Sequence, residues 1–463
     1  MGSRVVALSV SVVLAAGLVL PAAWNAAAAE PAPAGVLPAA DCKLESPLPP
    51  FNEGFPLSQG VAAATGVLTV QIVYAELPGH LVGIEGDQWI AKIRHEVGDA
   101  VTSLETMSGG LLDVEVREHP DWVTMPHDES AYPEDGDQAW THAEMTAFVT
   151  DAVMAADPMV DYTGVDVVWV AFPWVYPLAG RAQATSDLAV SVDGGAVTRA
   201  VTLPLASDGV LTGTMVHETG HTFGLPDLYD TSSPSGATSY IGKWDPMSDA
   251  DGEDFGSTVE FMGWHAWRLG WISDEQVTCV DPMSSVDVTL DALTRHGDSA
   301  IAVVPTSEHR AVVVESRKAE RFNAGIPQPG VLVYVVWTDA AFGAVFIGPR
   351  DGTAFPTDPD GFANATLLVG DRYTDPVAGF TVTVTASTEA SDSVRIEPPG
   401  APTEPPPAPT EPPAVPAAQT VDTGGMLPPT GTDPRVVAVG SVVLLLAGLL
   451  ALSAASRRRA TSR

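Results

Sequence analysis

Two histidines stand four residues apart in the segment HETGHTFGLPD, which covers residues 217 to 227. Positions i and i+4 of a helix lie one turn apart on the same face, so His217 and His221 can direct imidazole nitrogens at one metal ion. Zinc takes such ligands at about 2.0–2.1 Å. Glu218 lies one step round the helix, outside the ligand set but close to a zinc-bound water. The segment therefore predicts a catalytic zinc site with Glu218 as the general base.

A catalytic zinc site needs a third protein ligand and keeps one position open for water. Gly224 can end the helix, because glycine tolerates positive φ. The chain then turns back, and the carboxylate of Asp227 can complete the ligand set, with Asp230 as the alternative. A bare HExxH pattern arises by chance in about 1% of chains this long, and Gly224 and Asp227 make a chance match rarer. The competing interpretation is a pair of core histidines on a buried helix.

Other catalytic patterns are incomplete. The residue four positions after His95 is Asp99, so the pair His95–Glu96 is not expected to bind a metal. No GxSxG elbow occurs, which argues against a serine hydrolase of the α/β type. A zinc-activated water needs neither a serine nor a cysteine nucleophile.

The chain before the motif alternates between strand and helix patterns. β-Branched residues indicate buried strands at 67–77 and 165–172. Apolar residues at helical spacing indicate helices at 89–104 and 141–155. This alternation predicts an α+β domain over residues 61–280, with a mixed sheet and covering helices.

One edge strand of that sheet should align a peptide substrate through backbone hydrogen bonds. Residues 188–205 contain one or two strands around a turn at Gly194–Gly195, so Leu188–Val192 and Val201–Leu205 are the candidates. The aromatic segment 262–271 predicts a helix in the core.

After about residue 280 the pattern changes to short strands separated by turn residues. The segments DVTL, AVVVESR, GVLVYVVW and FTVTVTAS are examples. They predict a β-sandwich-like accessory domain over residues 281–396.

The chain has only two cysteines, Cys42 and Cys279. Outside the cell they can form a disulfide, and their number favours this pairing. In the alternative hypothesis, residues 30–60 are a short propeptide rather than a lead-in, and Cys42 binds the metal as a thiolate latch.

Four acidic residues are spaced like parts of a calcium loop: Asp249, Asp251, Glu253 and Glu260. The glycine falls at the wrong place for an EF-hand. An irregular Ca²⁺ site is the remaining hypothesis for this segment.

Both ends of the chain carry targeting patterns. Residues 1–29 combine Arg4, an apolar run and small residues, which is typical of a secretory signal peptide. Residues 397–426 are proline-rich and predict a polyproline-type stalk. Residues 427–463 hold LPPTG, an apolar segment at 436–455 and an arginine triplet.

This last order resembles the cell-wall sorting signal of Gram-positive bacteria. The resemblance implies that a sortase cleaves between Thr430 and Gly431 and joins Thr430 to peptidoglycan. The segment 436–455, long enough to span a bilayer, would then contact the membrane only transiently. An ordinary single-span anchor is the alternative.

The composition is strongly acidic, with 58 Asp and Glu against 22 Lys and Arg, for a formal charge of −36. Such a surface repels nucleic acid and anionic membranes. It is consistent with a secreted protein that acts outside the cell.

The segment HETGHTFGLPDLYD resembles the zinc motif of the immune inhibitor A family, secreted metallopeptidases related to the metzincins. Counterparts of SGGLLDVEV, VDVVWVAF, KWDPMSDA and WRLGWIS extend the resemblance over roughly residues 65 to 275. It implies a metzincin-like fold, with His217, His221 and Asp227 as zinc ligands and Glu218 as the catalytic base. Met247 would be the methionine of the turn beneath the zinc.

The turn departs from the family pattern. Asp245 and Pro246 precede Met247, where an apolar residue is commoner. No tyrosine follows Met247 closely, so an additional tyrosine ligand is not implied.

These observations predict a cell-wall-anchored zinc endopeptidase that hydrolyses proteins or peptides. A surface adhesin on a silent protease fold is the second hypothesis. A peptidoglycan amidase is the third.

Overall fold

A computed structural model describes residues 34–48, 51–80, 86–132, 141–173, 183–205, 212–230, 238–239, 241–248, 259–326, 328–340, 345–347, 362 and 364–400. The expected signal peptide, most of the stalk, the LPPTG motif with Thr430 and Gly431, and the segment 436–455 lie outside these residues. Within the described part, no helix has the length and apolarity that a membrane span requires. All described residues belong to a unit that ends at Pro407.

The first sheet is mostly parallel and has the order β3-β2-β5-β9-β6. Its strands are β2 (Gly66–Glu76), β3 (Leu112–Glu118), β5 (Val167–Pro173), β6 (Gln183–Thr185) and β9 (Ala200–Leu205), and β4 (Val123–Thr124) also pairs with β2. The first four in sheet order run parallel, with Val70 opposite Val167, whereas β6 is antiparallel to β9. The sheet therefore has one antiparallel edge.

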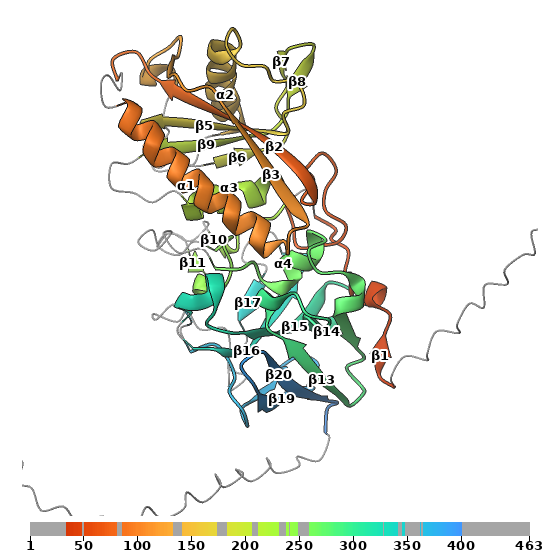
Figure 1. The fold of residues 1–463 in the computed structure, drawn as a ribbon. Helices are drawn as coiled ribbons and strands as arrows, with labels where there is room; N and C mark the ends of the chain where they lie inside the picture. The colour runs from red at the N-terminus through yellow and green to blue at the C-terminus, as the bar shows by residue number, and fades with distance from the viewer. Residues whose placement is uncertain are drawn as a thin grey trace, which may run out of the picture. The chain divides into compact units, whose positions relative to one another are not determined.

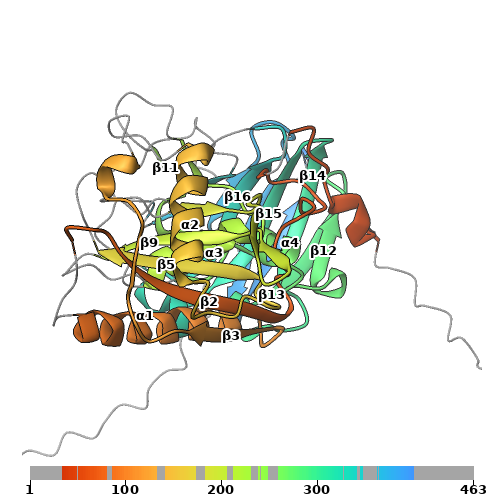
Figure 2. The same cartoon turned by 90° about the horizontal axis from the view of Figure 1, so that it is seen from above.

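Side chains alternate between the two faces of this sheet, as the two-residue period of a strand requires. Helices α1 (Gly86–Met107) and α3 (Thr212–Thr222) share a hydrophobic cluster with Ile72 and Trp169. Helix α2 (His142–Ala156) packs with Val73 and Val170 on the opposite face. Figures 1 and 2 show α2 on one side of the sheet and α1 and α3 on the other. Both faces are covered, which explains why β2 and β5 are nearly continuous hydrophobic runs.

The prediction that Val201–Leu205 is an edge strand is wrong, because β9 lies between β5 and β6. The other candidate, Leu188–Val192, overlaps β7 (Val190–Val192), which pairs with β8 (Gly195–Val197) in a separate hairpin. The described edge next to β9 is β6. Its three residues are too few for a strand pattern to be recognised in the sequence.

The second sheet has the order β1-β12-β14-β15-β16-β17, and the third β13-β20-β19-β18. The bounds are β1 (Val36–Leu37), β12 (Val277–Val280), β13 (Val286–Asp291), β14 (Ile301–Ser307), β15 (Arg310–Arg317), β16 (Gly330–Trp337), β17 (Val345–Ile347), β18 (Arg372–Thr374), β19 (Thr381–Ser387) and β20 (Ser391–Glu397). Strand β15 is buried along its whole length. Val312 and Val314 share a hydrophobic cluster with residues of the third sheet, and Val313 belongs to the cluster that contains residues of α1, α3 and α4.

The hydrophobic core around the motif helix continues past residue 280, where we expected a domain boundary. One cluster contains Phe223, next to α3, together with Trp264 of α4 (Gly263–Arg268) and Val313 of β15. Strand β1 of the lead-in pairs with β12. The β-rich region therefore shares one hydrophobic cluster with the motif helix, and α4 contacts β15.

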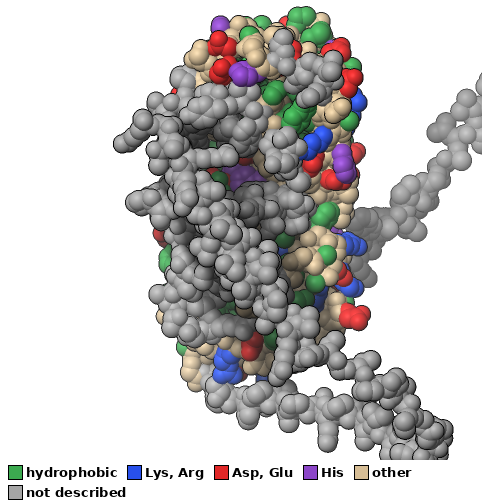
Figure 3. Space-filling model, turned by 90° about the vertical axis from the view of Figure 1, so that its left-hand side faces the viewer, with side chains coloured by type: hydrophobic (Ala, Val, Ile, Leu, Met, Phe, Trp, Pro, Cys, Tyr) green, Lys and Arg blue, Asp and Glu red, His purple; other side chains and the backbone are tan. Residues whose placement is uncertain are grey.

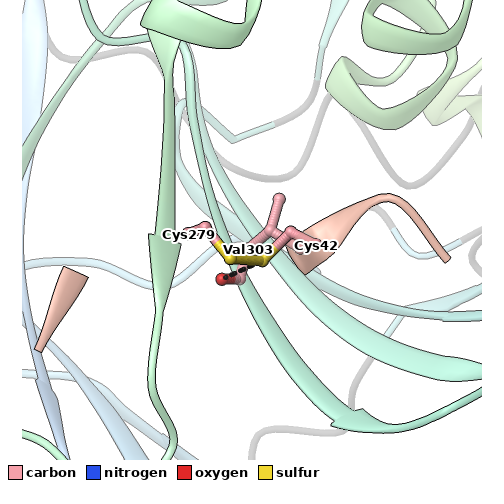
Figure 4. The surroundings of a disulfide bond; sticks show 3 residues. All are labelled: Cys42, Cys279 and Val303. Atoms are coloured by element: carbon pink, nitrogen blue, oxygen red, sulfur yellow. Dashed lines mark hydrogen bonds between the residues drawn. A yellow bond between two sulfur atoms is a disulfide. The ribbon is translucent and has the colours of Figure 1, made fainter. Parts of the chain in front are cut away.

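A disulfide fastens the lead-in to this sheet. The Sγ atoms of Cys42 and Cys279 are 2.08 Å apart, and both residues are fully buried (Figure 4). Cys42 Sγ also lies 3.3 Å from the carbonyl oxygen of Val303. Closing a loop of 237 residues contributes about 5 kcal/mol in the chain-entropy model. A cysteine in this bond has no thiolate to offer to a metal.

Candidate metal centre

The first turn of the motif helix is bound by α1. The Glu96 carboxylate accepts hydrogen bonds from the backbone N–H of Thr212, at 3.2 Å, and from its hydroxyl, at 2.7 Å. A carboxylate at a helix N-terminus is stabilising, because it meets unpaired N–H groups and the positive end of the helix dipole. Glu96, which the sequence excludes as a metal ligand, thus positions α3.

The last turn of α3 ends at a glycine, as the sequence predicts. Gly224 has φ +92°, and the N–H of Leu225 donates to the Gly220 carbonyl at 3.1 Å. A Cβ at Gly224 would lie 2.9 Å from Val61 Cγ1. The turn sends the chain back along the helix and brings Asp227 to the histidines.

Three side-chain atoms meet at one point. The Nε2 atoms of His217 and His221 are 3.2 Å apart. Asp227 Oδ1 lies 3.2 Å from the first and 3.1 Å from the second. Three ligands at about 2.05 Å from a tetrahedral zinc are separated by about 3.3 Å, so this triangle has the right size.

The hydrogen bonds of the two imidazoles also suit a metal. His217 Nδ1 lies 2.8 Å from the carbonyl oxygen of Pro246, and His221 Nδ1 lies 2.8 Å from that of Leu225. A carbonyl only accepts, so each Nδ1 carries the hydrogen and each Nε2 of a neutral ring presents a lone pair. Asp227 Oδ1 is buried and makes no hydrogen bond of acceptable geometry. A divalent cation would satisfy all three atoms.

Electrostatics favour a cation at the same point. Burial alone would lower the pKa of His221, but the carboxylates of Asp227 and Glu218 raise it to about 9. Burial also opposes ionisation of Asp227, yet the two imidazoles hold its pKa well below the usual range. A site that attracts protons to its nitrogens this strongly also attracts a metal ion.

Glu218 lies beside the triangle but is not part of it. Its side chain is buried, and Oε2 has no hydrogen-bond partner in the described part of the chain. Burial and the nearby Asp227 raise the pKa of the Glu218 carboxyl, although the imidazoles counteract them. A carboxylate with an unsatisfied oxygen and a raised pKa suits proton transfer.

Comparison with known proteins leaves the family open. No family model and no curated protein matches the chain. Two crystal structures of wild type OgpA from Akkermansia muciniphila are similar over 55% of this chain and 72% of that chain, at 11% sequence identity. Their TM-score is 0.24, so the likeness carries no argument about the fold. The resemblance to immune inhibitor A stays a prediction.

Met247 packs against the motif helix. Its side chain is fully buried, and a Cβ at Gly220 would lie 2.5 Å from its Sδ. Its carbonyl oxygen accepts from the N–H of Leu228 at 2.8 Å. The ring of Tyr229, which no sequence pattern singles out, is stacked on His217 with centroids 6.3 Å apart.

We expect Gly220→Ala to destabilise the protein by about 1–3 kcal/mol, because the added methyl overlaps Met247 in a filled core. Gly98→Ala in α1 is the matched control, since a Cβ there meets nothing within 4 Å. This control should gain about 0.5–1 kcal/mol from helix propensity. Urea unfolding measures the change in the free energy of unfolding for each variant. Equal changes in the two variants would mean that Met247 does not restrict the side chain at position 220.

Asp245 explains one departure from the family pattern. Its Oδ1 accepts from the N–H of Met247 at 2.8 Å, and its Oδ2 accepts from His265 Nδ1 at 2.9 Å. His265 Nε2 lies 3.0 Å from Glu53 Oε1, and Arg268 donates to Glu53 Oε2 at 3.1 Å. A buried polar chain thus connects the lead-in, α4 and the turn whose Pro246 carbonyl holds His217.

This network predicts a pH dependence of stability. Burial alone would lower the pKa of His265, but Asp245 and Glu53 raise it to about 10, from 6.5 in an unfolded chain. The positive charge of His265 makes its full contribution to the free energy of unfolding below pH 6.5. This contribution is lost as the pH rises towards 10. The stability difference between wild type and His265→Gln should therefore shrink by up to about 1.4 kcal/mol per pH unit in that window. Urea unfolding at several pH values tests this, and parallel curves would contradict it.

Strand β15 also supports the turn. Arg317 donates to the carbonyl oxygens of Trp244 at 3.0 Å and Glu260 at 3.1 Å. Its neighbour Glu315 accepts from Arg317 at 2.6 Å and from the N–H of Gly263 at 2.7 Å. The VVVESR segment therefore anchors both α4 and the residues before Met247.

The calcium hypothesis names four residues, and three of them lie outside the described part of the chain: Asp249, Asp251 and Glu253. Glu260 is described and buried, and burial raises its pKa to about 7. Within the described residues, the group able to hold a metal ion is His217, His221 and Asp227. The backbone of Asp230, the alternative third ligand, lies in β10 (Tyr229–Asp230), paired with β11 (Thr238–Ser239).

Proposed function

We propose that this protein is a zinc-dependent endopeptidase that hydrolyses peptide bonds with a water molecule and a glutamate base. The observation that carries the proposal is the triangle of His217 Nε2, His221 Nε2 and Asp227 Oδ1, with edges of 3.1–3.2 Å. Two nitrogen donors and one oxygen donor are a set that a catalytic zinc ion takes from proteins, which supports the proposal.

The chemistry divides between the ion and the chain. A zinc ion held by His217, His221 and Asp227 would supply a Lewis acid, which would acidify a water molecule and polarise the substrate carbonyl. Glu218 accepts the proton of the attacking water and delivers it to the leaving amide nitrogen. The carbonyls of Pro246 and Leu225 keep both imidazoles oriented and hold the Nδ1 protons in place.

The antiparallel edge of the first sheet is where we propose that the substrate backbone binds. β6 pairs with β9, and no strand among the described residues pairs with its other edge. An extended peptide can add to such an edge by backbone hydrogen bonds. β6 also contacts α3, which carries the histidines.

We propose a metzincin-like architecture for the first sheet and its helices, and a β-sandwich-like one for the second and third sheets. The position of Met247 against α3 supports the first, and the core shared by β15 and β20 supports the second. In this architecture the second sheet stabilises the turn at Met247 through Arg317 of β15.

We further propose that the protein is secreted and attached to the cell wall through Thr430. The disulfide supports an oxidising compartment. Where the face in Figure 3 is not covered by grey atoms, acidic side chains lie scattered among Lys and Arg side chains. The formal charge of the whole sequence is −36. Deleting LPPTG should abolish the covalent bond to peptidoglycan, so that the protein no longer co-purifies with the cell wall, and continued covalent attachment to the wall would contradict sorting.

Residues 30–397, purified, provide the direct test. We expect one zinc per chain and cleavage of casein that a chelator abolishes and zinc restores. If residues 30–397 bind zinc but cleave no protein, the result would favour the adhesin hypothesis. Release of muropeptides from peptidoglycan, without casein cleavage, would favour the amidase.

A further inference from the structure

The turn at Met247 contacts two of the three candidate ligand positions. The carbonyl oxygen of Pro246 lies 2.8 Å from His217 Nδ1. The carbonyl oxygen of Met247 accepts from the N–H of Leu228 at 2.8 Å, and Leu228 directly follows Asp227. A shift of this turn would therefore displace an imidazole and a carboxylate together, although metal ligands need to be held closely in place.

The buried carboxylate of Asp245 fixes the shape of this turn. Its Oδ1 accepts from the N–H of Met247 at 2.8 Å, and its Oδ2 accepts from the N–H of Met262 at 2.6 Å. His265 Nδ1 lies 2.9 Å from the same Oδ2. An amide has only one oxygen, so an asparagine at this position could not accept all three hydrogen bonds.

A row of buried charges extends from Asp245 to Glu53 of the lead-in. His265 has a carboxylate oxygen at each ring nitrogen, Asp245 Oδ2 at 2.9 Å and Glu53 Oε1 at 3.0 Å. A neutral imidazole carries one N–H, so only the imidazolium donates to both carboxylates. Arg268 donates to Glu53 Oε2 at 3.1 Å. Two cations thus face two carboxylates, and all four groups are buried.

The backbone of the lead-in is held at the same place. Trp264 Nε1 donates to the carbonyl oxygen of Glu53 at 3.0 Å. Arg268 donates to the carbonyl oxygens of Asn52 at 2.6 Å and Gly54 at 3.1 Å. Removing this segment would leave the two cations of α4 with one carboxylate between them, and uncompensated buried charge is strongly destabilising.

The lead-in also meets the motif helix directly. The Phe51 ring meets the His221 ring edge-on, with centroids 6.5 Å apart. The N–H of Ala62 donates to the carbonyl oxygen of Thr222, the last residue of α3, at 2.7 Å. Phe51 thus contacts the second histidine, whereas the row of charges leads to the first, so substitutions can separate the two routes.

We propose that Glu53 and Asp245 are positioning residues of the candidate metal centre, and that the lead-in is a permanent part of this centre rather than a propeptide. Glu53 holds the imidazolium of His265 against Asp245. Asp245 then fixes the turn that orients His217 and Asp227. The inference rests on the proposed function for the identity of the metal ligands.

The zinc affinity of the purified protein, measured by competition with a chromophoric chelator, tests the proposal. We expect Asp245→Asn to weaken zinc binding about ten- to hundredfold, as the loss of a group that orients a ligand does. Glu53→Gln acts one contact further away and should weaken it about three- to tenfold. The double variant should bind zinc no more weakly than Asp245→Asn alone, because both residues act through the same contacts.

Three control variants should bind zinc like the wild type. Glu45→Gln changes an exposed glutamate of the same lead-in. Val394→Ala lowers stability in the core between the second and third sheets, away from these contacts. Phe51→Ala removes the direct contact with His221. If Phe51→Ala weakens zinc binding and Glu53→Gln does not, the lead-in acts by the direct contact and the proposal is overturned.

A measurement on the wild type covers the case in which the buried substitutions prevent folding. Coupling between two sites acts in both directions, so zinc should slow hydrogen exchange in the lead-in. The N–H of Phe55, which donates to the carbonyl oxygen of Leu44 at 2.8 Å, is the reporter. An exchange rate at Phe55 that zinc leaves unchanged would overturn the proposal.

The outcomes distinguish this proposal from the proposed function. A wild type that binds zinc and cleaves casein, with a Glu53→Gln variant of equal zinc affinity, overturns the positioning role but not the peptidase. Equal losses of zinc affinity in Glu53→Gln and Val394→Ala would reflect stability alone and also overturn the positioning role. A wild type that binds no zinc overturns both proposals.

Discussion

Replacing Glu218 with Gln should leave the zinc content unchanged and lower kcat on an unfolded protein by about a hundredfold to ten-thousandfold. Glutamine has the shape of glutamate but cannot take a proton from water. Glu218 lies outside the ligand triangle, so the three ligand atoms are untouched. Metal analysis and a casein-cleavage assay on the same preparation measure the zinc content and kcat.

Glu275→Gln is the control for this substitution, because Glu275 is an exposed glutamate far from the motif in the sequence. It should keep both zinc and activity. A Glu218→Gln protein that retains zinc and full activity would remove Glu218 from the mechanism. Loss of zinc as well would mean that Glu218 belongs to the ligand set.

Replacing His221 with Ala should abolish both zinc binding and activity. The substitution deletes one corner of the triangle and leaves Asp227 Oδ1 with a single imidazole neighbour. Removing groups that only orient a ligand already costs about 10–100-fold in metal affinity. We therefore expect a loss of more than about a hundredfold, measured by zinc competition with a chromophoric chelator.

His95→Ala is the matched control, since His95 is an exposed histidine on α1 whose contact is Asp99 at 3.6 Å. It should bind zinc like the wild type. Asp227→Asn should weaken binding less than His221→Ala, because the amide oxygen still coordinates but the charge is gone. A His221→Ala protein with one tightly bound zinc and normal activity would place the metal elsewhere.

The local part of the site could be predicted from the sequence. The spacing of His217 and His221 decides their common face on any helix, because helical periodicity is a property of the backbone. Gly224 signals where the helix ends, since its positive φ needs no side chain to be accommodated. Together they place Asp227 near the imidazoles before any tertiary contact is known. The strands β2 and β5 were also predictable, from their runs of β-branched residues.

The supporting contacts could not be predicted, because each joins residues far apart in the chain. Glu96 and Thr212 are 116 positions apart, and Glu53 and His265 are 212 apart. In the sequence, Glu96 is an acidic residue on an amphipathic helix and Glu53 is one in a proline-rich lead-in. Neither pattern predicts which residue forms the hydrogen bond with that carboxylate. Asp245 in particular has no apparent reason to precede Met247 until His265 is placed against it.

The sequence by itself determined the candidate site: which side chains could bind a metal, which could carry a proton, and which helical turn presents them. The tertiary structure decided everything that depends on packing. Among the described residues it placed β6 rather than β9 at the edge of the first sheet, and it placed the lead-in beside His221 and joined the second sheet to the turn at Met247. The physical reason is the separation along the chain over which each effect acts. Helix periodicity and glycine turns depend on a few neighbouring residues. Strand order and buried polar networks form only when distant segments pack into one core.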